Sequence, residues 1–402
     1  MPITLDRPGA STADRELRAE LVDRAAKLLP LLAGNADRTD RDRLVVKENI
    51  DAIAGAGLLS ILQPARYGGL QTDFRTCLEV SREIARACGS TAWSTTLLNV
   101  CAWYAGLFPG QAQDDIWARE PGTRIAGVLA PTGTAREADG GIVVSGRWSP
   151  ASGSAHAQWA ILGVLRGTGD GLEPGLVLVP MAELAVEDTW FVAGMRGTAS
   201  NTLAADEVLV PGHRYLAMPD ALEGRYPTPH TDVALYRSAF VPVSALVLAG
   251  PQLGLAQAAL DLVVEKAPHR KMTYTFYDSQ SAAPTTQLAL AQAASLIDSA
   301  HLHAYRAAAE IDEAAARGTY PGYDARARLR MDTGVAAVNA REAIRILMSA
   351  HGAGSFAEAN PLQRIWRDSE TGSRHAIVSP EVSAEVYGKS LLGIRGTVTD
   401  LV

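Results

Sequence analysis

The chain has 402 residues, with 37 Lys and Arg against 44 Asp and Glu, which gives a net charge of −7. Hydrophobic residues make up 47% of the chain and charged residues 20%, a composition typical of a globular protein with two or three domains. The acidic balance, without a basic stripe of interleaved aromatics, argues against nucleic acid as a partner. The three cysteines form no CxxC pair, so neither a disulfide framework nor a zinc site is indicated.

The first residues, MPITLDRPGA, have neither the basic nor the apolar region of a secretory signal. We therefore expect a cytoplasmic protein. Segment 238–260 is uncharged and long enough to cross a bilayer. Two prolines and two glutamines interrupt this segment, which favours a buried bundle helix over a membrane span.

The first part of the chain is predicted to be an N-terminal helical domain, residues 1–120. Apolar residues recur there with helical spacing, and Ser90 precedes the last run as a plausible N-cap. The helices are expected over 13–33, 43–56, 73–88 and 90–107.

Residues 121–228 change character, because Gly, Pro, Val and Thr separate short runs with a two-residue period. The run GGIVVSGRW, residues 140–148, predicts a strand, and residues 159–165 are predicted to return beside it. These features indicate a central β-sandwich or barrel domain over 121–228.

Helical spacing resumes in residues 229–402. Long helices are expected over 244–266, 284–317 and 324–350, followed by shorter ones up to residue 391. The proline-rich stretch 217–232 before them is either a plain linker or a loop that faces a substrate. Helices, then strands, then long helices predict an α+β fold that ends in a four-helix bundle.

The connection between the two predicted strands, within RWSPASGSAHAQW (147–159), consists mainly of small residues. One interpretation is an ordinary turn, because Pro, Ser and Gly are the residues that turns use. The other is that Ser152 and Gly153 leave space for a flat ligand to approach the backbone. The pattern alone leaves both open.

Common catalytic motifs are missing from the sequence. The runs GAGLLS at 55 and GAGSFA at 352 lack the third glycine of a dinucleotide fingerprint, so no nicotinamide site is predicted. There is no GxSxG elbow and no HExxH motif. His301 and His303 lie two apart on a predicted helix, which points them to different faces, so no metal site is expected.

Three stretches together carry a family resemblance. They are RWSPASGSAHAQW, GMRGTAS (194–200) and NPLQRIWRDSETGSRHA (360–376). In this order they resemble segments of the oxygenase components of two-component flavin-dependent monooxygenases with the acyl-CoA dehydrogenase fold. That group includes the enzymes acting on p-hydroxyphenylacetate and dibenzothiophene. The resemblance extends from about residue 25 to 392.

The resemblance implies that a separate NAD(P)H:flavin reductase supplies reduced FMN, with FAD as the alternative, and that O2 is the co-substrate. A C4a-(hydro)peroxyflavin would then hydroxylate a small molecule. By the same resemblance, Ser152 would contact flavin N5, and Trp148 would line the ring together with backbone at Leu129, Ala130 and Thr132. The small residues of the connection would leave room for the isoalloxazine plane.

Two further roles follow from the resemblance. His375 matches a histidine beside flavin C4a, where an imidazole can exchange a proton with the bound oxygen species. Arg270 matches an arginine that reaches the flavin phosphate, in a neighbouring subunit, by bidentate recognition. A homotetramer assembled through the terminal bundle is expected on the same ground.

The sequence departs from the phenol-hydroxylating members of the family at the substrate side. Where they carry a histidine, the stretch STAWSTTLLNVCAWYAGLFP presents Asn99, Cys101 and Trp103. With Phe240, these residues predict a pocket for a bulky aromatic or polycyclic molecule rather than a monocyclic phenol.

Three alternatives were weighed. An acyl-CoA dehydrogenase needs a glutamate base, but of the two places where that family carries it, RDSETGSRHA lacks the family's YEG pattern and VPVSALVLAG has no acid. A non-catalytic small-molecule scaffold would have no need for Ser152 and His375. An N- or S-oxygenase of the same family remains open.

Overall fold

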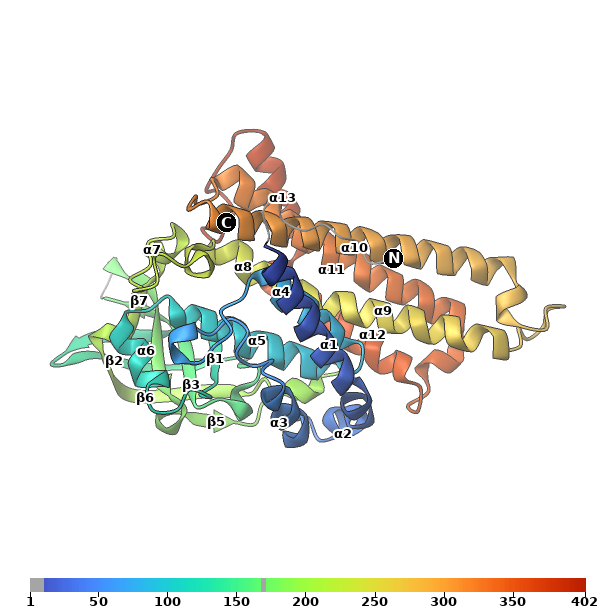
Figure 1. Cartoon of the computed structure of the whole chain (residues 1–402), viewed down its shortest axis with the longest axis horizontal. Coiled ribbons are helices and arrows are strands. Elements are labelled where there is room, and N and C mark those ends of the chain that lie inside the picture. Colours follow the sequence, from blue (N-terminus) through green and yellow to red (C-terminus); the bar gives the residue numbers. More distant parts are fainter. Residues whose placement is uncertain (1–10, 168–170) are drawn as a thin grey trace.

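The computed structural model describes residues 11–167 and 171–402 and has an α+β architecture. A seven-stranded sheet occupies one end of the molecule and a bundle of long helices the other, with the N-terminal helices between them (Figure 1). The predicted order of helices, strands and long helices is therefore confirmed.

Within the described part of the N-terminal region, residues 11–120, there are six α-helices. They are α1 (Thr12–Gly34), α2 (Ala36–Arg41), α3 (Lys47–Gly55), α4 (Phe74–Ala85), α5 (Gly89–Gly106) and α6 (Gly110–Trp117). The helix expected over 43–56 is wrong in its first part, because Arg43 has a left-handed backbone (φ 54°) and the helix begins only at Lys47. Ser90 is not the N-cap of α5: the cap is Cys88, and Ser90 lies inside the first turn.

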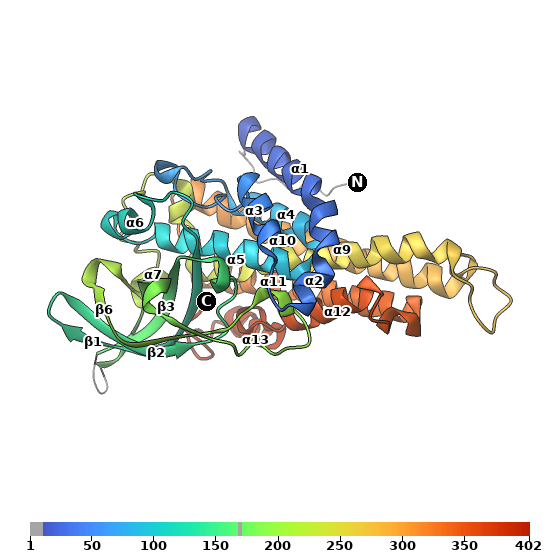
Figure 2. The same cartoon turned by 90° about the horizontal axis from the view of Figure 1, so that it is seen from below.

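Helix α5 lies at the centre of the molecule. Nearly all of its residues are buried, because it contacts the sheet through β1 and the bundle through α9. A helix that is apolar and small all round, as this one is, belongs in the interior. Figure 2 shows α5 lying along the sheet, on the side facing the remaining helices.

The strands are β1 (Ile125–Ala138), β2 (Gly141–Trp148), β3 (Trp159–Arg166), β4 (Glu173–Pro180), β5 (Ala185–Glu187), β6 (Thr202–Pro211) and β7 (Tyr215–Ala217). Their order in the sheet is β5-β6-β2-β1-β3-β4-β7. The predicted pairing of residues 159–165 beside 142–148 is wrong, because β1 lies between them, antiparallel to β2 and parallel to β3. The connection after β2 therefore passes across β1, near the centre of the molecule.

The two faces of the sheet bury different cores. In β3, Ile161 faces the large core formed with the helices, whereas Ala160, Leu162 and Val164 face a second core built from the sheet itself. Such alternation is what a strand buried on both faces requires. The predicted β-sandwich or barrel is thus a single open sheet with a core of its own on one face.

The C-terminal region begins with two short helices, α7 (Met218–Leu222) and α8 (Phe240–Leu246). The longer ones are α9 (Ala249–Lys266), α10 (Pro284–Ala316), α11 (Tyr323–His351), α12 (Pro361–Gly372) and α13 (Pro380–Leu391). Helices α9, α10, α11 and α12 pack on one another as the predicted bundle. Residues 217–232 are irregular apart from α7.

The segment Phe240–His269 is long and apolar enough to cross a membrane. However, 78% of its most apolar window is buried inside the protein, in α8 and α9. The expectation of a buried bundle helix is therefore confirmed.

Candidate active site

Three segments that are far apart in the sequence meet at the N-terminal half of α5. They are the connection after β2, the GMRGTAS stretch before β6, and the turn after α12. Trp93 of α5 donates its indole N–H to the Oγ atom of Ser152 at 3.3 Å. The ring of His375 lies 6.1 Å from that of Trp93, between centroids. The structure thus brings both predicted catalytic residues next to the same tryptophan.

A row of buried hydroxyls extends from Ser152 into the protein. The Ser152 Oγ atom lies 2.7 Å from that of Ser200, which lies 2.6 Å from the Thr198 hydroxyl. Thr198 donates in turn to the carbonyl of Met195 at 2.9 Å. Ser152 is 6% exposed, Thr198 2% and Ser200 1%, so these bonds are shielded from water.

The backbone fixes the position of Ser152. Ala151 and Gly153 on either side donate their N–H groups to the carbonyls of Asn201 and Thr198, at 3.1 and 3.2 Å. Gly153 has φ +76°, a left-handed conformation that glycine adopts most readily, and a Cβ atom there would lie 3.4 Å from Leu98. The connection is therefore a turn, as one interpretation held, and the turn also holds the Ser152 hydroxyl in place.

The predicted flavin-lining backbone lies in a break of the sheet. The ladder between β1 and β3 jumps from Val128 to Gly133 while β3 advances only from Leu162 to Val164. Residues 129–132 therefore bulge out of the ladder, and Ala130 and Thr132 are exposed. The carbonyl oxygens of Leu129 and Ala130 lie against Gly163 of β3, so the surface that this stretch offers to a ligand is that of the exposed residues Ala130 and Thr132.

Trp148 requires a correction, because it does not line an open surface. Its side chain is fully buried in the sheet core, next to Gly133 and Gly146, and its indole donates to the carbonyl of Gly163 at 2.7 Å. Gly163 lies opposite the bulge, where a Cβ atom would be 2.3 Å from the Leu129 carbonyl oxygen. Trp148 therefore supports the bulge from inside the sheet.

His375 lies on the turn between α12 and α13. Its side chain is exposed to solvent, yet the surrounding protein is dense enough that desolvation lowers its pKa. An accessible ring inside dense protein is the arrangement expected in a cleft. Its Nδ1 atom accepts the N–H of Ile377 at 3.4 Å, so the neutral ring carries its proton on Nε2.

Helix α12 is anchored to the GMRGTAS stretch. The carboxylate of Asp368, which is 2% exposed, accepts the N–H of Met195 at 2.5 Å. Burial raises the pKa of Asp368 to about 6, against the lowering effect of that hydrogen bond. Gly89 at the start of α5 allows this approach, since a Cβ atom there would lie 2.8 Å from the carboxylate.

The predicted substrate residues, three on α5 and one on α8, are all buried, but they face different neighbours. Asn99 requires a correction: both of its amide hydrogens are used by the carbonyls of Leu58 and Thr95, and its oxygen accepts from Ile61 N. Its role is to tie α5 to the segment after α3.

Of the three remaining residues, Trp103 and Phe240 pack together, whereas Cys101, two residues before Trp103 on α5, points to a different face of the helix. Cys101 contacts β1 at Gly127, and Trp103 donates to the carbonyl of Leu235 at 2.9 Å. Phe240 packs on Trp103, with ring centroids 6.1 Å apart. Their contact with a substrate stays a prediction.

Arg270 lies away from this site within one chain. It follows α9 at the end of the bundle farthest from the sheet (Figure 1), where it donates to the His351 carbonyl at 3.1 Å. Its Nε atom is buried and has no hydrogen-bond partner among the described residues. A phosphate contact made by Arg270 would therefore be to the flavin of another subunit, as predicted.

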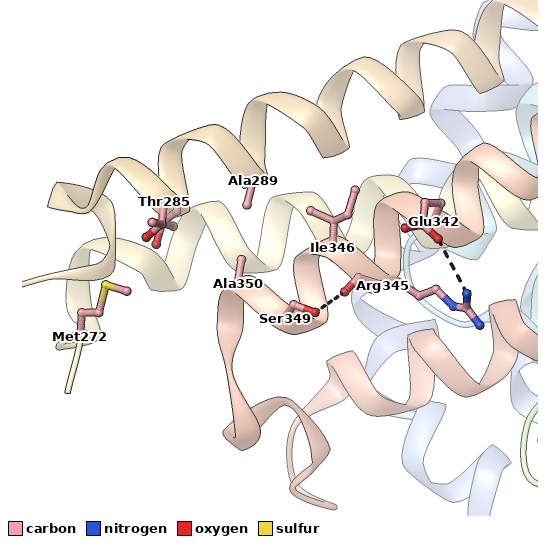
Figure 3. Close-up of a pocket in the computed structure, with 9 residues that line it drawn as sticks. Met272, Thr285, Ala289, Glu342, Arg345, Ile346, Ser349 and Ala350 are labelled. Atoms are coloured by element: carbon pink, nitrogen blue, oxygen red, sulfur yellow. Dashed lines mark hydrogen bonds and ion pairs between the residues drawn. The ribbon is translucent and has the colours of Figure 1, made fainter. Parts of the chain in front are cut away.

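A cavity of about 490 Å³ opens near Arg270, between α10, α11 and the loop after α9 (Figure 3). Met272, Thr285 and Ile346 are among its lining residues. It shares no residue with the Ser152 site. Over residues 11–167 and 171–402, no group of three or more His, Cys, Asp or Glu could hold a metal ion.

Sequence reasoning missed Trp93, Thr198 and Ser200 as members of the site. The last two lie in the quoted GMRGTAS stretch, where hydroxyl residues next to glycines were a usable signal. Trp93 had none, because helix α5 is buried on all sides and its sequence does not indicate which face meets the connection.

Comparison with known proteins identifies the class first. Family models of the acyl-CoA dehydrogenase N-terminal and C-terminal domains match residues 11–119 and 246–380, the helical regions on either side of the sheet. Within that fold the chain belongs to the oxygenase components of flavin-dependent monooxygenases, as the relatives below establish, so it is an enzyme and a flavoprotein.

Two curated relatives cover almost the whole chain. The oxygenase subunit HsaA of a flavin-dependent monooxygenase from Mycobacterium tuberculosis is 33% identical over 91% of this chain and 94% of its own. The oxygenase component of an FADH2-dependent resorcinol hydroxylase from Rhizobium sp. is 32% identical over 95% and 96%. Among solved structures, XiaF from Streptomyces sp., in complex with FADH2 and glycerol, is 37% identical over 96% and 98%, with a TM-score of 0.91.

Proposed function

We propose that this oxygenase hydroxylates a bulky aromatic or polycyclic substrate next to a reduced flavin, with Ser152 and His375 as the two groups that face the flavin. The observation that carries the proposal is the convergence of both residues on Trp93. The flavin, when bound, supplies the activation of dioxygen. Ser152 holds one edge of the ring, and the neutral imidazole of His375 presents its Nε2 proton.

The residues fit a flavin on two observations of this structure. Ala130 and Thr132 are exposed at the break in the sheet, and the buried Nε atom of Arg270, which has no hydrogen-bond partner among the described residues, is left for a phosphate. Trp103 and Phe240 are aromatic and pack on one another, and Cys101 faces β1, so the surroundings of α5 are apolar, which suits a flat substrate of some size. The named relatives act on resorcinol, p-hydroxyphenylacetate and indole-3-acetate, all of them aromatic.

The substrate class can be tested with the reconstituted system. Purified protein, reduced flavin and O2 would be supplied with matched monocyclic phenols, indoles and fused polycyclic aromatics. We expect more hydroxylated product per flavin oxidised from the fused compounds than from the phenols. Product from phenols alone would contradict the assignment, and oxidation confined to nitrogen or sulfur would favour the remaining alternative.

We further propose that the chain uses reduced FMN, with FAD as the alternative. The support is mixed, since XiaF was solved with FADH2 and a more distant structure with FMN. Arg270 would bind the phosphate common to both flavins. Titration of reduced riboflavin, FMN and FAD tests this: Arg270→Ala should weaken binding of FMN and FAD but leave riboflavin unchanged.

We also propose that the enzyme is a cytoplasmic homotetramer served by a separate NAD(P)H:flavin reductase. The relatives' names describe oxygenase components and subunits, which supports a second protein. Three free, buried cysteines suit a reducing compartment. In the loop after Arg270, Tyr274 and Phe276 are fully exposed, as an unpaired subunit contact would be. Light scattering of the wild type and of Phe276→Ser should separate tetramer from smaller species.

A further inference from the structure

The hydroxyl row beside the flavin site has chemically distinct ends. At one end, the Trp93 indole N–H can only donate, and it donates to Ser152. At the other end, the Met195 carbonyl can only accept. It accepts from the Thr198 hydroxyl, and also from the Trp190 indole and the Thr198 amide. Between these ends lie only the hydroxyls of Ser152, Ser200 and Thr198.

Counting protons fixes the direction of this row. Three short oxygen–oxygen contacts, of 2.7, 2.6 and 2.9 Å, need one proton each, and three hydroxyl protons are present. Since the carbonyl has none to give, Thr198 must donate to Met195, Ser200 to Thr198 and Ser152 to Ser200. Any other arrangement leaves two lone pairs facing each other at hydrogen-bond distance in a buried site, which is unfavourable.

In this arrangement Ser152 can make only one further kind of hydrogen bond, as an acceptor. Its proton is committed to Ser200, and one lone pair accepts from Trp93, so what remains is a second lone pair. We infer that Thr198 and Ser200 act as positioning residues that turn Ser152 into an obligate hydrogen-bond acceptor and thereby make the site select reduced over oxidised flavin. The inference rests on the proposed contact between Ser152 and flavin N5.

The chemistry of N5 explains the selection. In reduced flavin, N5 carries a hydrogen and can donate to the free lone pair of Ser152. In oxidised flavin, N5 has no hydrogen and is itself an acceptor, so the two atoms would face each other without a proton. The protein would therefore gain a hydrogen bond with the reduced form and suffer an unsatisfied contact with the oxidised form, which favours exchange of spent flavin for fresh.

The test measures binding rather than turnover. Dissociation constants for dithionite-reduced and for oxidised FMN would be obtained anaerobically on the wild type, Thr198→Val and Ser200→Ala. Either change removes a hydroxyl that fixes the direction of donation from Ser152 towards Met195. The Ser152 proton is then free to point at N5. We expect the preference for reduced flavin to fall by about three- to tenfold, the usual size of one hydrogen bond. A tenfold loss corresponds to a fall of about 30 mV in the midpoint potential of the bound flavin.

Thr198→Ser is the matched control, because it keeps the hydroxyl and removes only a methyl group. It should retain the wild-type preference, whereas a purely structural role for Thr198 would make Thr198→Ser and Thr198→Val similar. Melting temperatures of all variants show whether they fold, and Ser200→Ala stands in if Thr198→Val does not. An unchanged or increased preference in folded Thr198→Val and Ser200→Ala would overturn the inference. Failure of the wild type to bind reduced flavin would instead overturn the proposed function.

Discussion

Ser152 and His375 differ in burial and in hydrogen bonding, although both lie next to Trp93. Ser152 is buried, is bonded to two side chains and has its neighbours' backbone tied to residues 198–201. His375 is exposed and has one long contact to Ile377 N. Changes at the two positions should therefore be separable, with effects on flavin handling in one case and on proton transfer in the other.

Replacing Ser152 by alanine should release more hydrogen peroxide per flavin oxidised and give less product. The lost hydroxyl removes one contact to the flavin edge, and loss of one such group costs about 10²–10³ in rate at comparable sites. The neighbouring Ser154 provides a control, because its buried hydroxyl has no partner among the described residues. Peroxide and product assays on Ser152→Ala and Ser154→Ala should differ, and equal coupling in both would remove Ser152 from the site.

Replacing His375 by alanine should lower product formation by about 10²–10⁴, the usual contribution of one positioned acid–base group. Thermal stability should stay within about 0.5 kcal/mol of the wild type, since the side chain is exposed and weakly bonded. The exposed His269, at the far end of the bundle, is the control, and its replacement by alanine should leave the rate unchanged. A full rate in His375→Ala would exclude the imidazole from the reaction.

At the scale of elements, the site depends on how α12 docks against α5 and the stretch before β6. Asp368 makes this contact by accepting the Met195 N–H, and the hydroxyl row ends at the carbonyl of the same Met195. Arg367 beside it pairs with Asp40 of α2. The docking of one helix thus positions both His375, three residues beyond its end, and the acceptor that orients Ser152.

Asp368 makes the stability of this contact depend on pH. Its pKa is raised from the ordinary value of 3.8 to about 6, so ionisation opposes folding and stability is lost as pH rises from about 4 through 6. Asp368→Asn keeps an acceptor without the charge. From pH 5 to pH 7.5, we expect the free energy of unfolding of the variant to rise relative to that of the wild type by an amount on the order of 1–3 kcal/mol. Urea unfolding at both pH values measures it, and a pH-independent difference would refute the assignment.

Some elements could be predicted from the sequence and some could not, for physical reasons. The long helices and β2 follow from periodicity, and Ser152 stands out because a Ser–Gly step is unusual between two tryptophan-bearing strands. The neighbours of β2 were not predictable, because local alternation does not say which strands pair. The true start of α5 could not be predicted either. Gly89, its first residue, docks against Asp368, and a contact between residues 279 positions apart leaves no local signal in the sequence.

At the scale of the whole molecule, the chain has a flavin site but no nicotinamide fingerprint. Homogeneous protein with added flavin should therefore not oxidise NADH above the background of free flavin. A flavin reductase added to the same mixture should start NADH consumption and product formation together. Rapid NADH oxidation by the chain alone, checked in a spectrophotometer, would contradict the division of labour proposed for it.

The family resemblance correctly gave the fold and the class of enzyme, whereas the roles of single residues needed the structure. Trp148 was assigned to the site by a motif match and Asn99 by a departure from the family, yet the polar atoms of both bond inside the protein. A motif match predicts where a residue lies along the chain, but it does not predict which way its side chain points. Ser152 and His375 are brought together only through Trp93, which belongs to neither of their segments.

The central claim is that this protein binds reduced flavin and directs its reaction with oxygen. Stopped-flow mixing of chemically reduced FMN and protein with oxygenated buffer tests it most directly, with flavin absorbance followed at several wavelengths. We predict reoxidation in distinct phases that differ from those of free FMN and change in His375→Ala. If the absorbance trace recorded with the protein superimposed on the trace of free FMN, the account would be contradicted.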